Sequence, residues 1–154
     1  MKESMGLVPA LSIVLIFIVF ISGYLAFTIN YSKAFKAKSR IINLIQQHDN
    51  EVDKAIGDIA EYLDEINYKT TDKLMAKGCN NSDGWETKNT AQYGWCYKII
   101  TTEDNKNGET KGKGTQKKYV KIRTFISIDI PIINNLFAGF DVFYVDGSTK
   151  ATSY

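Results

Sequence analysis

The residues best suited to covalent chemistry are the two cysteines of the chain, Cys79 and Cys96. They bracket a polar stretch rich in asparagine and glycine, and their spacing matches no zinc-binding motif. Two thiols that close a loop beyond a membrane-length segment are typical of a disulfide in an oxidising compartment. We therefore predict a Cys79–Cys96 disulfide, with two unrelated free thiols as the alternative. The disulfide would place the C-terminal domain outside the cytoplasm.

Other reactive side chains do not form a recognisable catalytic or metal site. His48 is the only histidine of the chain, and it has no partner nearby in the sequence. A phosphate-binding loop needs a strand–loop–helix context, which is missing around the glycines that lie among lysines, namely Gly108, Gly112 and Gly114. The sequence therefore predicts a protein that is not an enzyme and that uses no cofactor or metal.

Aromatic and basic side chains offer binding chemistry instead. Trp85 and Trp95 lie within the loop between the cysteines, where we expect them to cover the core beside the disulfide, with an aromatic pair for a ligand as the alternative. A basic tip is formed by lysines in and after a polar loop, namely Lys106, Lys111, Lys113, Lys117 and Lys118. A solvated loop is the simpler interpretation, and a surface for an acidic partner or an anionic polymer is the alternative. The net charge of +2 is too small to indicate nucleic acid.

The N-terminal stretch reads as a membrane segment. No charged side chain occurs from Ser4 to Ser32, and this run exceeds the about 20 apolar residues that cross a bilayer as a helix. A secretory signal has a shorter apolar region of about 7–15 residues and a small-residue cleavage site. A retained, single-pass transmembrane helix over residues 1–32 is favoured over a cleaved signal and over a buried helix of a soluble protein.

The orientation of this helix rests on two conflicting signals. Basic residues follow the apolar run directly, namely Lys33, Lys36, Lys38 and Arg40. Read alone, they would keep the C-terminal part in the cytoplasm. Large domains translocate largely regardless of charge, so the cysteine loop carries more weight. We expect a cytoplasmic N-terminus and an extracytoplasmic C-terminal domain in the cell membrane or in a surface filament.

Helical periodicity continues beyond the membrane run. Apolar residues at a three-to-four spacing form a stripe of Phe35, Ile42, Ile45, Val52, Ile56, Ile59, Leu63 and Ile66. We predict helices over about 5–47 and 50–75, either continuous or broken near Asp49-Asn50, with Asn50 as the N-cap and Gly78 as the stop. In this amphipathic stalk, residues 33–77, the stripe packs on its own domain or, alternatively, forms a seam for neighbouring helices.

The remaining residues, 78–154, are predicted as a disulfide-closed antiparallel β domain. Strands are expected over 95–102, 117–130 and 141–145, with a long polar hairpin loop that turns at Asn107-Gly108. Alternation puts one set of residues of the second strand on a single face, namely Val120, Ile122, Thr124, Ile126, Ile128 and Ile130. The fold class is α+β, with a membrane helix, a stalk and a small sheet of three to four strands.

This order of elements is similar to that of type IV pilins. The N-terminal residues Glu3-Ser4-Met5-Gly6-Leu7-Val8-Pro9-Ala10-Leu11 resemble the start of TadE-like minor pseudopilins of tight-adherence pili. In that family a glutamate stands six positions before a proline at the front of the apolar helix, and Glu3 and Pro9 match those positions. The resemblance implies that Glu3 pairs with the amino terminus of a neighbouring subunit and that Pro9 loosens the first helical turns.

The resemblance also implies a function. It indicates a non-enzymatic minor component or initiator of a pilus or secretion apparatus, whose partners are the lipid bilayer and neighbouring pilin-like helices or an assembly platform protein. The residues alone leave alternatives open. Glu3 and Lys2 could be solvated flanks of an anchor, and the chain could be a membrane-anchored extracytoplasmic binding domain for a cell-surface ligand or polymer. A cytoplasm-facing anchored adaptor is a third interpretation.

Overall fold

A computed structural model of the chain describes residues 4–68, 78–87, 90–103, 116–126 and 143–153. The chain divides into two units. Residues 1–32 and 128–141 form the first, and residues 33–127 and 142–154 form the second. The described part of the first unit is helical, whereas the second combines helices with an antiparallel sheet, so the predicted α+β class is confirmed.

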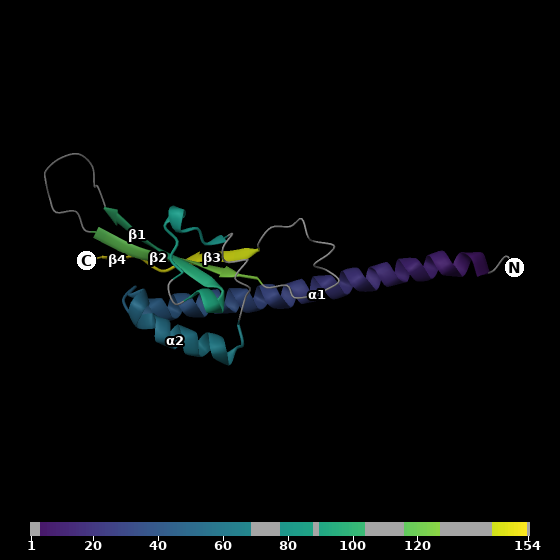
Figure 1. Cartoon of the computed structure of the whole chain (residues 1–154), viewed down its shortest axis with the longest axis horizontal. Helices are drawn as coiled ribbons and strands as arrows, with labels where there is room; N and C mark the ends of the chain where they lie inside the picture. Colours follow the sequence, from purple (N-terminus) through teal and green to yellow (C-terminus); the bar gives the residue numbers. More distant parts are fainter. Residues whose placement is uncertain (1–3, 69–77, 88–89, 104–115, 127–142, 154) are drawn as a thin grey trace. The chain divides into compact units, whose positions relative to one another are not determined.

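The first helix, α1, extends from Ser4 to Gln47, as the sequence predicts (Figure 1). Its segment Pro9–Gln47 is long and apolar enough to cross a membrane. Large apolar side chains are exposed at consecutive positions from Ile13 to Ile21, with exposed fractions between 38% and 69%. Because consecutive residues point in all directions around a helix, apolar surface surrounds this part of α1 instead of forming one stripe.

A tight turn separates α1 from the second helix, α2, which extends from Val52 to Glu65. Asp49 and Asn50 adopt left-handed backbone conformations, with φ of 53° and 61°, and this ends α1. The prediction that Asn50 caps α2 is wrong. The N-cap residue is Glu51, whose side chain makes no capping hydrogen bond. Asn50 is fully buried and bonds to other elements.

The second helix also ends earlier than the sequence indicates. It stops at Glu65 instead of near residue 75, and a left-handed Asn67, with φ of 49°, follows. The side chain of His48 contacts Asp58, and Arg40 lies 5.8 Å from the ring centroid of Tyr62. These two contacts show that α2 folds back alongside the C-terminal part of α1 (Figure 1).

The helical stripe of the second unit packs on its own domain. Of the eight predicted stripe residues, Ile45, Val52, Ile59 and Leu63 are buried, and Ile42, Ile56 and Ile66 are half-buried. The interpretation that the stripe packs on its own domain therefore holds for these residues, but not for Phe35, which is 46% exposed. The buried surface also includes residues outside the predicted stripe, namely Ala34, Ala37, Ile41, Leu44 and Ala55.

Within the described residues the sheet has four antiparallel strands, at the upper limit of the predicted number. They are β1 (Trp95–Glu103), β2 (Gln116–Phe125), β3 (Tyr144–Ser148) and β4 (Thr152–Ser153). The central strand is β2, which pairs with β1 on one side and with β3 and β4 on the other. The hairpin loop, its Asn107-Gly108 turn and the predicted strand residues beyond 126 lie outside the described residues.

The sequence predicts a last strand over 141–145, of which residues 141–142 lie outside the described part of the chain. In the structure β3 begins at Tyr144 and continues through Gly147. Glycine weakens a strand, so the sequence indicates an end at this point. A Cβ at position 147 would stand 2.7 Å from Ile42 and 2.9 Å from Lys38. Gly147 therefore allows α1 to approach the sheet closely.

The two faces of β2 differ. Val120, Ile122 and Thr124 face the helices, and the hydroxyl of Thr124 donates to the carbonyl of Ala34 at 3.2 Å. Phe125 lies on the other face but is also fully buried. The face that carries Cys96, Arg123 and Phe125 is called the disulfide face below.

Candidate functional site

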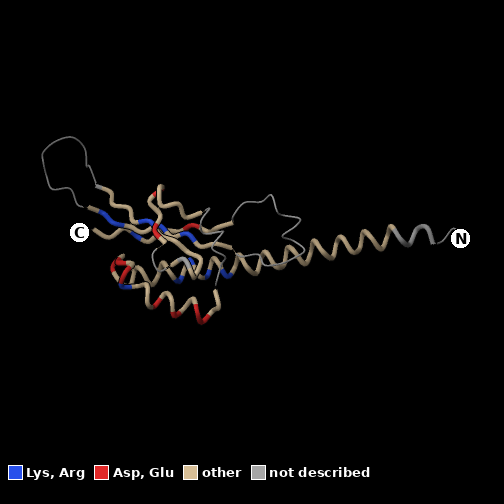
Figure 2. The backbone as a smooth tube through the Cα atoms, viewed as in Figure 1, with Lys and Arg blue, Asp and Glu red and all other residues tan. Residues whose placement is uncertain are grey.

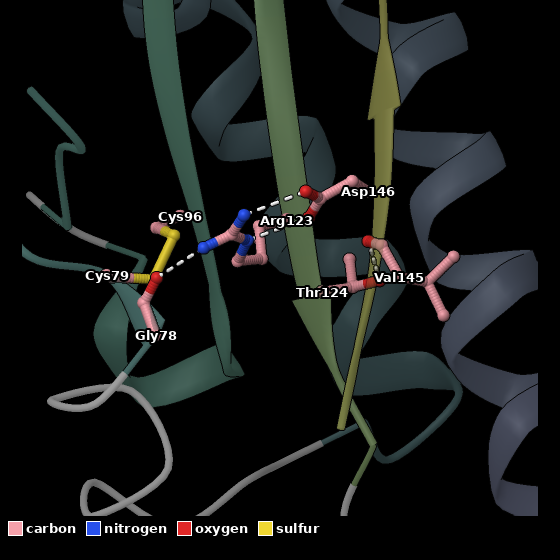
Figure 3. The surroundings of a disulfide bond; sticks show 7 residues. All are labelled: Gly78, Cys79, Cys96, Arg123, Thr124, Val145 and Asp146. Carbon is pink, nitrogen blue, oxygen red and sulfur yellow. Dashed lines mark hydrogen bonds and ion pairs between the residues drawn. A yellow bond between two sulfur atoms is a disulfide. The ribbon is translucent and has the colours of Figure 1, made fainter. Parts of the chain in front are cut away.

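The predicted disulfide is present. Cys79 and Cys96 are joined, with their Cα atoms 6.2 Å apart, and the bond ties the segment before the 3-10 turn η1 (Asn81–Asp83) to β1. Both cysteines are buried in a cluster with Phe125, against which Trp85 packs. The disulfide is thus the centre of a small second core, on the side of the sheet that faces away from the helices (Figure 3).

Gly78 contributes to this second core in a way that the sequence did not indicate. A Cβ at position 78 would overlap the ring of Phe125, so only glycine lets the backbone pass this close. The sequence predicts Gly78 as the stop of a helix, but the residues directly before it lie outside the described part of the chain. Its observed role is the close approach to Phe125.

Arg123 connects several parts of the disulfide face. Its Nε and Nη2 atoms donate to the two carboxylate oxygens of Asp146 at 2.7 and 2.8 Å, and Nη1 donates to the carbonyl of Gly78 at 2.8 Å (Figure 3). Its guanidinium lies 4.4 Å from the ring centroid of Trp85 and 3.9 Å from that of Tyr144. Hydrogen bonding to Asp146 raises the pKa of Arg123 further. Arg123 therefore acts as a permanently charged connector between three segments.

The two tryptophans lie on opposite faces of the sheet. Trp85 packs on the disulfide face, whereas Trp95, which is 1% exposed, faces the helices and lies 5.9 Å from the ring of Tyr97. The structure does not bring the two indoles together. It places Trp85 beside the disulfide and Trp95 in the main core.

The predicted basic tip is described only in part. Lys106, Lys111 and Lys113 lie outside the described residues. Lys117 and Lys118 are adjacent in β2, so their side chains leave opposite faces of the sheet. The lysines that share the disulfide face with Lys117 are instead Lys98 and Lys121, which the sequence analysis did not single out.

The candidate assembly residues occupy the start of the chain. Glu3 lies outside the described residues. Pro9 lies inside α1, six residues into its length. Proline has no amide hydrogen, so the carbonyl of Met5 lacks the donor that continues the helical ladder, and the first turn of α1 is held by fewer hydrogen bonds.

Titratable groups of the second unit serve as structural ties. The Nε2 atom of His48 lies 2.9 Å from the carboxylate of Asp58. The hydroxyl of Tyr68 donates to the carbonyl of Phe125, and burial raises the pKa of Tyr68 well above its ordinary value. The hydroxyl of Tyr93 donates to Asp64 at 3.0 Å, which raises its pKa. Within the described ranges no group of three or more His, Cys, Asp or Glu side chains could hold a metal ion.

Sequence reasoning missed Arg123 as a central residue. The sequence pattern that could have indicated Arg123 is the alternation of the predicted strand, which puts Arg123 on the same face as Phe125, two residues later. Arg123 lies beside the disulfide because the pairing of β1 with β2 places it directly opposite Cys96. The sequence does not reveal this pairing of residues between the two strands. Comparisons of this chain with protein-family models, with curated proteins and with solved structures find no match.

Proposed function

We propose that the chain is a non-enzymatic, pilin-like membrane subunit, a minor component or initiator of a pilus or secretion apparatus, that assembles through its N-terminal helix. The observation that carries the proposal is α1, one helix of 44 residues with two different surfaces. Its N-terminal part is apolar on all sides, and its C-terminal part is buried in an α+β domain. A helix that is apolar all round needs lipid or other helices as its surroundings.

Glu3 and Pro9 give this helix a means of selecting its neighbours. A carboxylate at the edge of hydrocarbon is costly unless it finds a partner. The amino terminus of an adjacent subunit would provide that partner and would fix the register between stacked helices. Pro9 weakens the hydrogen bonding of the first turn, which allows that turn to adjust to its neighbour.

We also propose that the N-terminus is cytoplasmic and that the domain is extracytoplasmic. The disulfide supports this orientation, because such bonds persist in oxidising compartments. Two of the four basic residues after the apolar run also have a structural use in the second unit. The ammonium of Lys38 lies 4.0 Å from the ring centroid of Phe35, and Arg40 lies near Tyr62. Their presence therefore does not require a cytoplasmic location.

Reporter cysteines test this orientation in intact cells. In a Lys150→Cys variant the new thiol is at an exposed position of the second unit and should react with a membrane-impermeant maleimide. A Lys2→Cys variant should react only after the cells are permeabilised. The reverse pattern, with labelling of Lys2→Cys alone in intact cells, would exclude an extracytoplasmic domain.

The Glu3→Ala variant tests assembly through the helix. Two differently tagged copies of the chain are extracted together from membranes at 0.5 M salt, where contacts between exposed charges are screened. We expect Glu3→Ala to insert normally and to lower the co-purification of the second copy several-fold, because the buried charge pair is lost. Lys2→Ala is the matched control and should have little effect. Equal co-purification in the Glu3→Ala variant would leave Glu3 as a flank of the anchor.

A further inference from the structure

The disulfide face carries an unusual pair of like charges. Lys98 of β1 and Lys121 of β2 stand directly opposite each other in the register of the two strands. Side chains in this position are about 5 Å apart at Cβ, and like charges there destabilise a sheet. Arg123 on the same face is already matched by Asp146. Asp146 therefore does not offset the repulsion between Lys98 and Lys121, because both of its carboxylate oxygens are bonded to Arg123.

Neither lysine is paired with a carboxylate within the described part of the chain. The ammonium of Lys98 donates to the backbone carbonyl of Asp83, and the side chain of Lys121 is exposed. A carbonyl oxygen satisfies a hydrogen bond but carries no full charge. We call Lys98 and Lys121 the basic sheet face.

Helix α2 carries the opposite charge. From Glu51 to Glu65 the chain has six carboxylates and one lysine, and Figure 2 shows the carboxylates in red along this helix. Glu61 and Glu65 are exposed on the side of α2 away from its buried residues, and their spacing of four residues puts their side chains on one face. Asp58 is also exposed, but its carboxylate already pairs with His48. We call Glu61 and Glu65 the acidic helix face.

Gly57 adds a steric observation. It lies in the exposed part of α2, and nothing in the structure stands within 4 Å of a Cβ added there. Glycine in the interior of a helix lowers the stability of the helix by about 1 kcal/mol relative to alanine. No contact within the described chain explains why position 57 is a glycine. A glycine next to the acidic helix face leaves room for another surface to approach the helix backbone closely.

The dimensions of the two faces are compatible. The two carboxylates of the acidic helix face are about 6 Å apart along the helix axis, which is four residues of α-helix. Cross-strand neighbours such as Lys98 and Lys121 are about 5 Å apart. Helix α2 lies on the side of the sheet opposite to the disulfide face, so the two faces cannot meet within one molecule (Figure 1).

We propose that the acidic helix face of one chain docks on the basic sheet face of a second copy of this chain. The contact joins two different surfaces, so it is heterologous and builds an open row or a closed ring of copies. Carboxylates from the partner would also relieve the repulsion between Lys98 and Lys121. The contact lies between the domains and does not depend on the helix contact proposed above.

Charge reversal in the full-length chain, purified in a non-ionic detergent, tests this contact. At about 50 mM salt the unaltered chain should self-associate, and at 0.5 M salt it should do so much less, since exposed charges are then screened. The sheet variant Lys98→Glu/Lys121→Glu and the helix variant Glu61→Lys/Glu65→Lys should each weaken association by about tenfold or more. Sedimentation velocity measures the size distribution.

The decisive result comes from combining the variants. An equimolar mixture of the sheet variant and the helix variant should associate again, because each acidic face then meets a basic one. A chain with all four substitutions should also associate alone. Lys150→Glu is the control for Lys121→Glu, because it makes the same charge change elsewhere on the surface and should have little effect.

Three outcomes would overturn the proposal. The first is self-association that neither variant changes. The second is a mixture that does not associate although each variant alone has lost association. The third is a sheet variant that self-associates normally but no longer binds added phosphatidylserine nanodiscs, which would assign the basic sheet face to an anionic membrane. The Glu3→Ala experiment is made at 0.5 M salt, so failure of either proposal can be told from failure of the other.

Discussion

Replacement of Asn50 by aspartate is expected to lower the free energy of unfolding of the second unit by about 4 kcal/mol. The Nδ2 atom of Asn50 donates to the carbonyls of Lys118 and Lys150, at 3.3 and 2.9 Å, and to the hydroxyl of Thr152 at 3.0 Å. A carboxylate of the same shape would direct negative charge at these oxygens in a fully buried site. Urea unfolding of the full-length chain, followed by tryptophan fluorescence, measures the change.

Glycine substitutions separate the side chain from the backbone. Asn50→Gly keeps the left-handed conformation but loses the hydrogen bonds, and should cost about 2–3 kcal/mol. Asn67 has a similar φ of 49° and is exposed, so Asn67→Gly is the matched control and should change stability by less than about 0.5 kcal/mol. Equal effects at the two positions would show that the contacts of the Asn50 side chain contribute nothing.

Removal of the disulfide is the second change with a large expected effect. The double variant Cys79→Ala/Cys96→Ala should lose about 3 kcal/mol, the value for a closed loop of about 15 residues, because the unfolded chain regains its freedom. The loss of the sulfur atoms from the cluster with Phe125 adds a packing cost. Urea unfolding gives the free energy, and the emission of Trp85 reports on the cluster itself.

Reductant is the internal control for this experiment. The unaltered chain with reductant should approach the stability of the double variant, and the double variant should not respond to reductant. A double variant as stable as the oxidised chain would mean that Arg123, Gly78 and Phe125 hold this part of the domain without the covalent bond.

The long elements could be predicted from the sequence because their patterns are strong. Uninterrupted apolar residues specify α1, and strict alternation specifies β2. Weaker patterns failed where a distant partner decides the structure. Gly147 indicates the end of a strand in the sequence, but in the structure it lies within β3, where α1 approaches the sheet closely. Strand β4 has only two residues, which pair with Lys117 and Lys118, and so short a strand leaves no pattern in the sequence. Asn50 reads as a helix cap, but its side chain finds acceptors 68 to 102 residues away.

The candidate site shows the same division. The disulfide could be predicted because cysteine type, loop composition and compartment agree. Arg123 could not, since its partners Asp146 and Gly78 are 23 and 45 residues away in the sequence. The basic sheet face likewise depends on the pairing of β1 with β2, which places Lys98 directly opposite Lys121. Residue types alone show neither arrangement.

The position of the disulfide also bears on how the protein would respond to a pulling force. A pilus subunit of the kind proposed above would carry tension along its chain when the pilus is stretched. Cys79 and Cys96 are 17 residues apart in the sequence, and the bond between them prevents the chain between them from being pulled out. That segment would otherwise contribute about 60 Å of extended chain. Under load, the segment with η1 and Trp85 would stay closed after the rest of the sheet had opened, and the domain would lengthen less than its residue count implies.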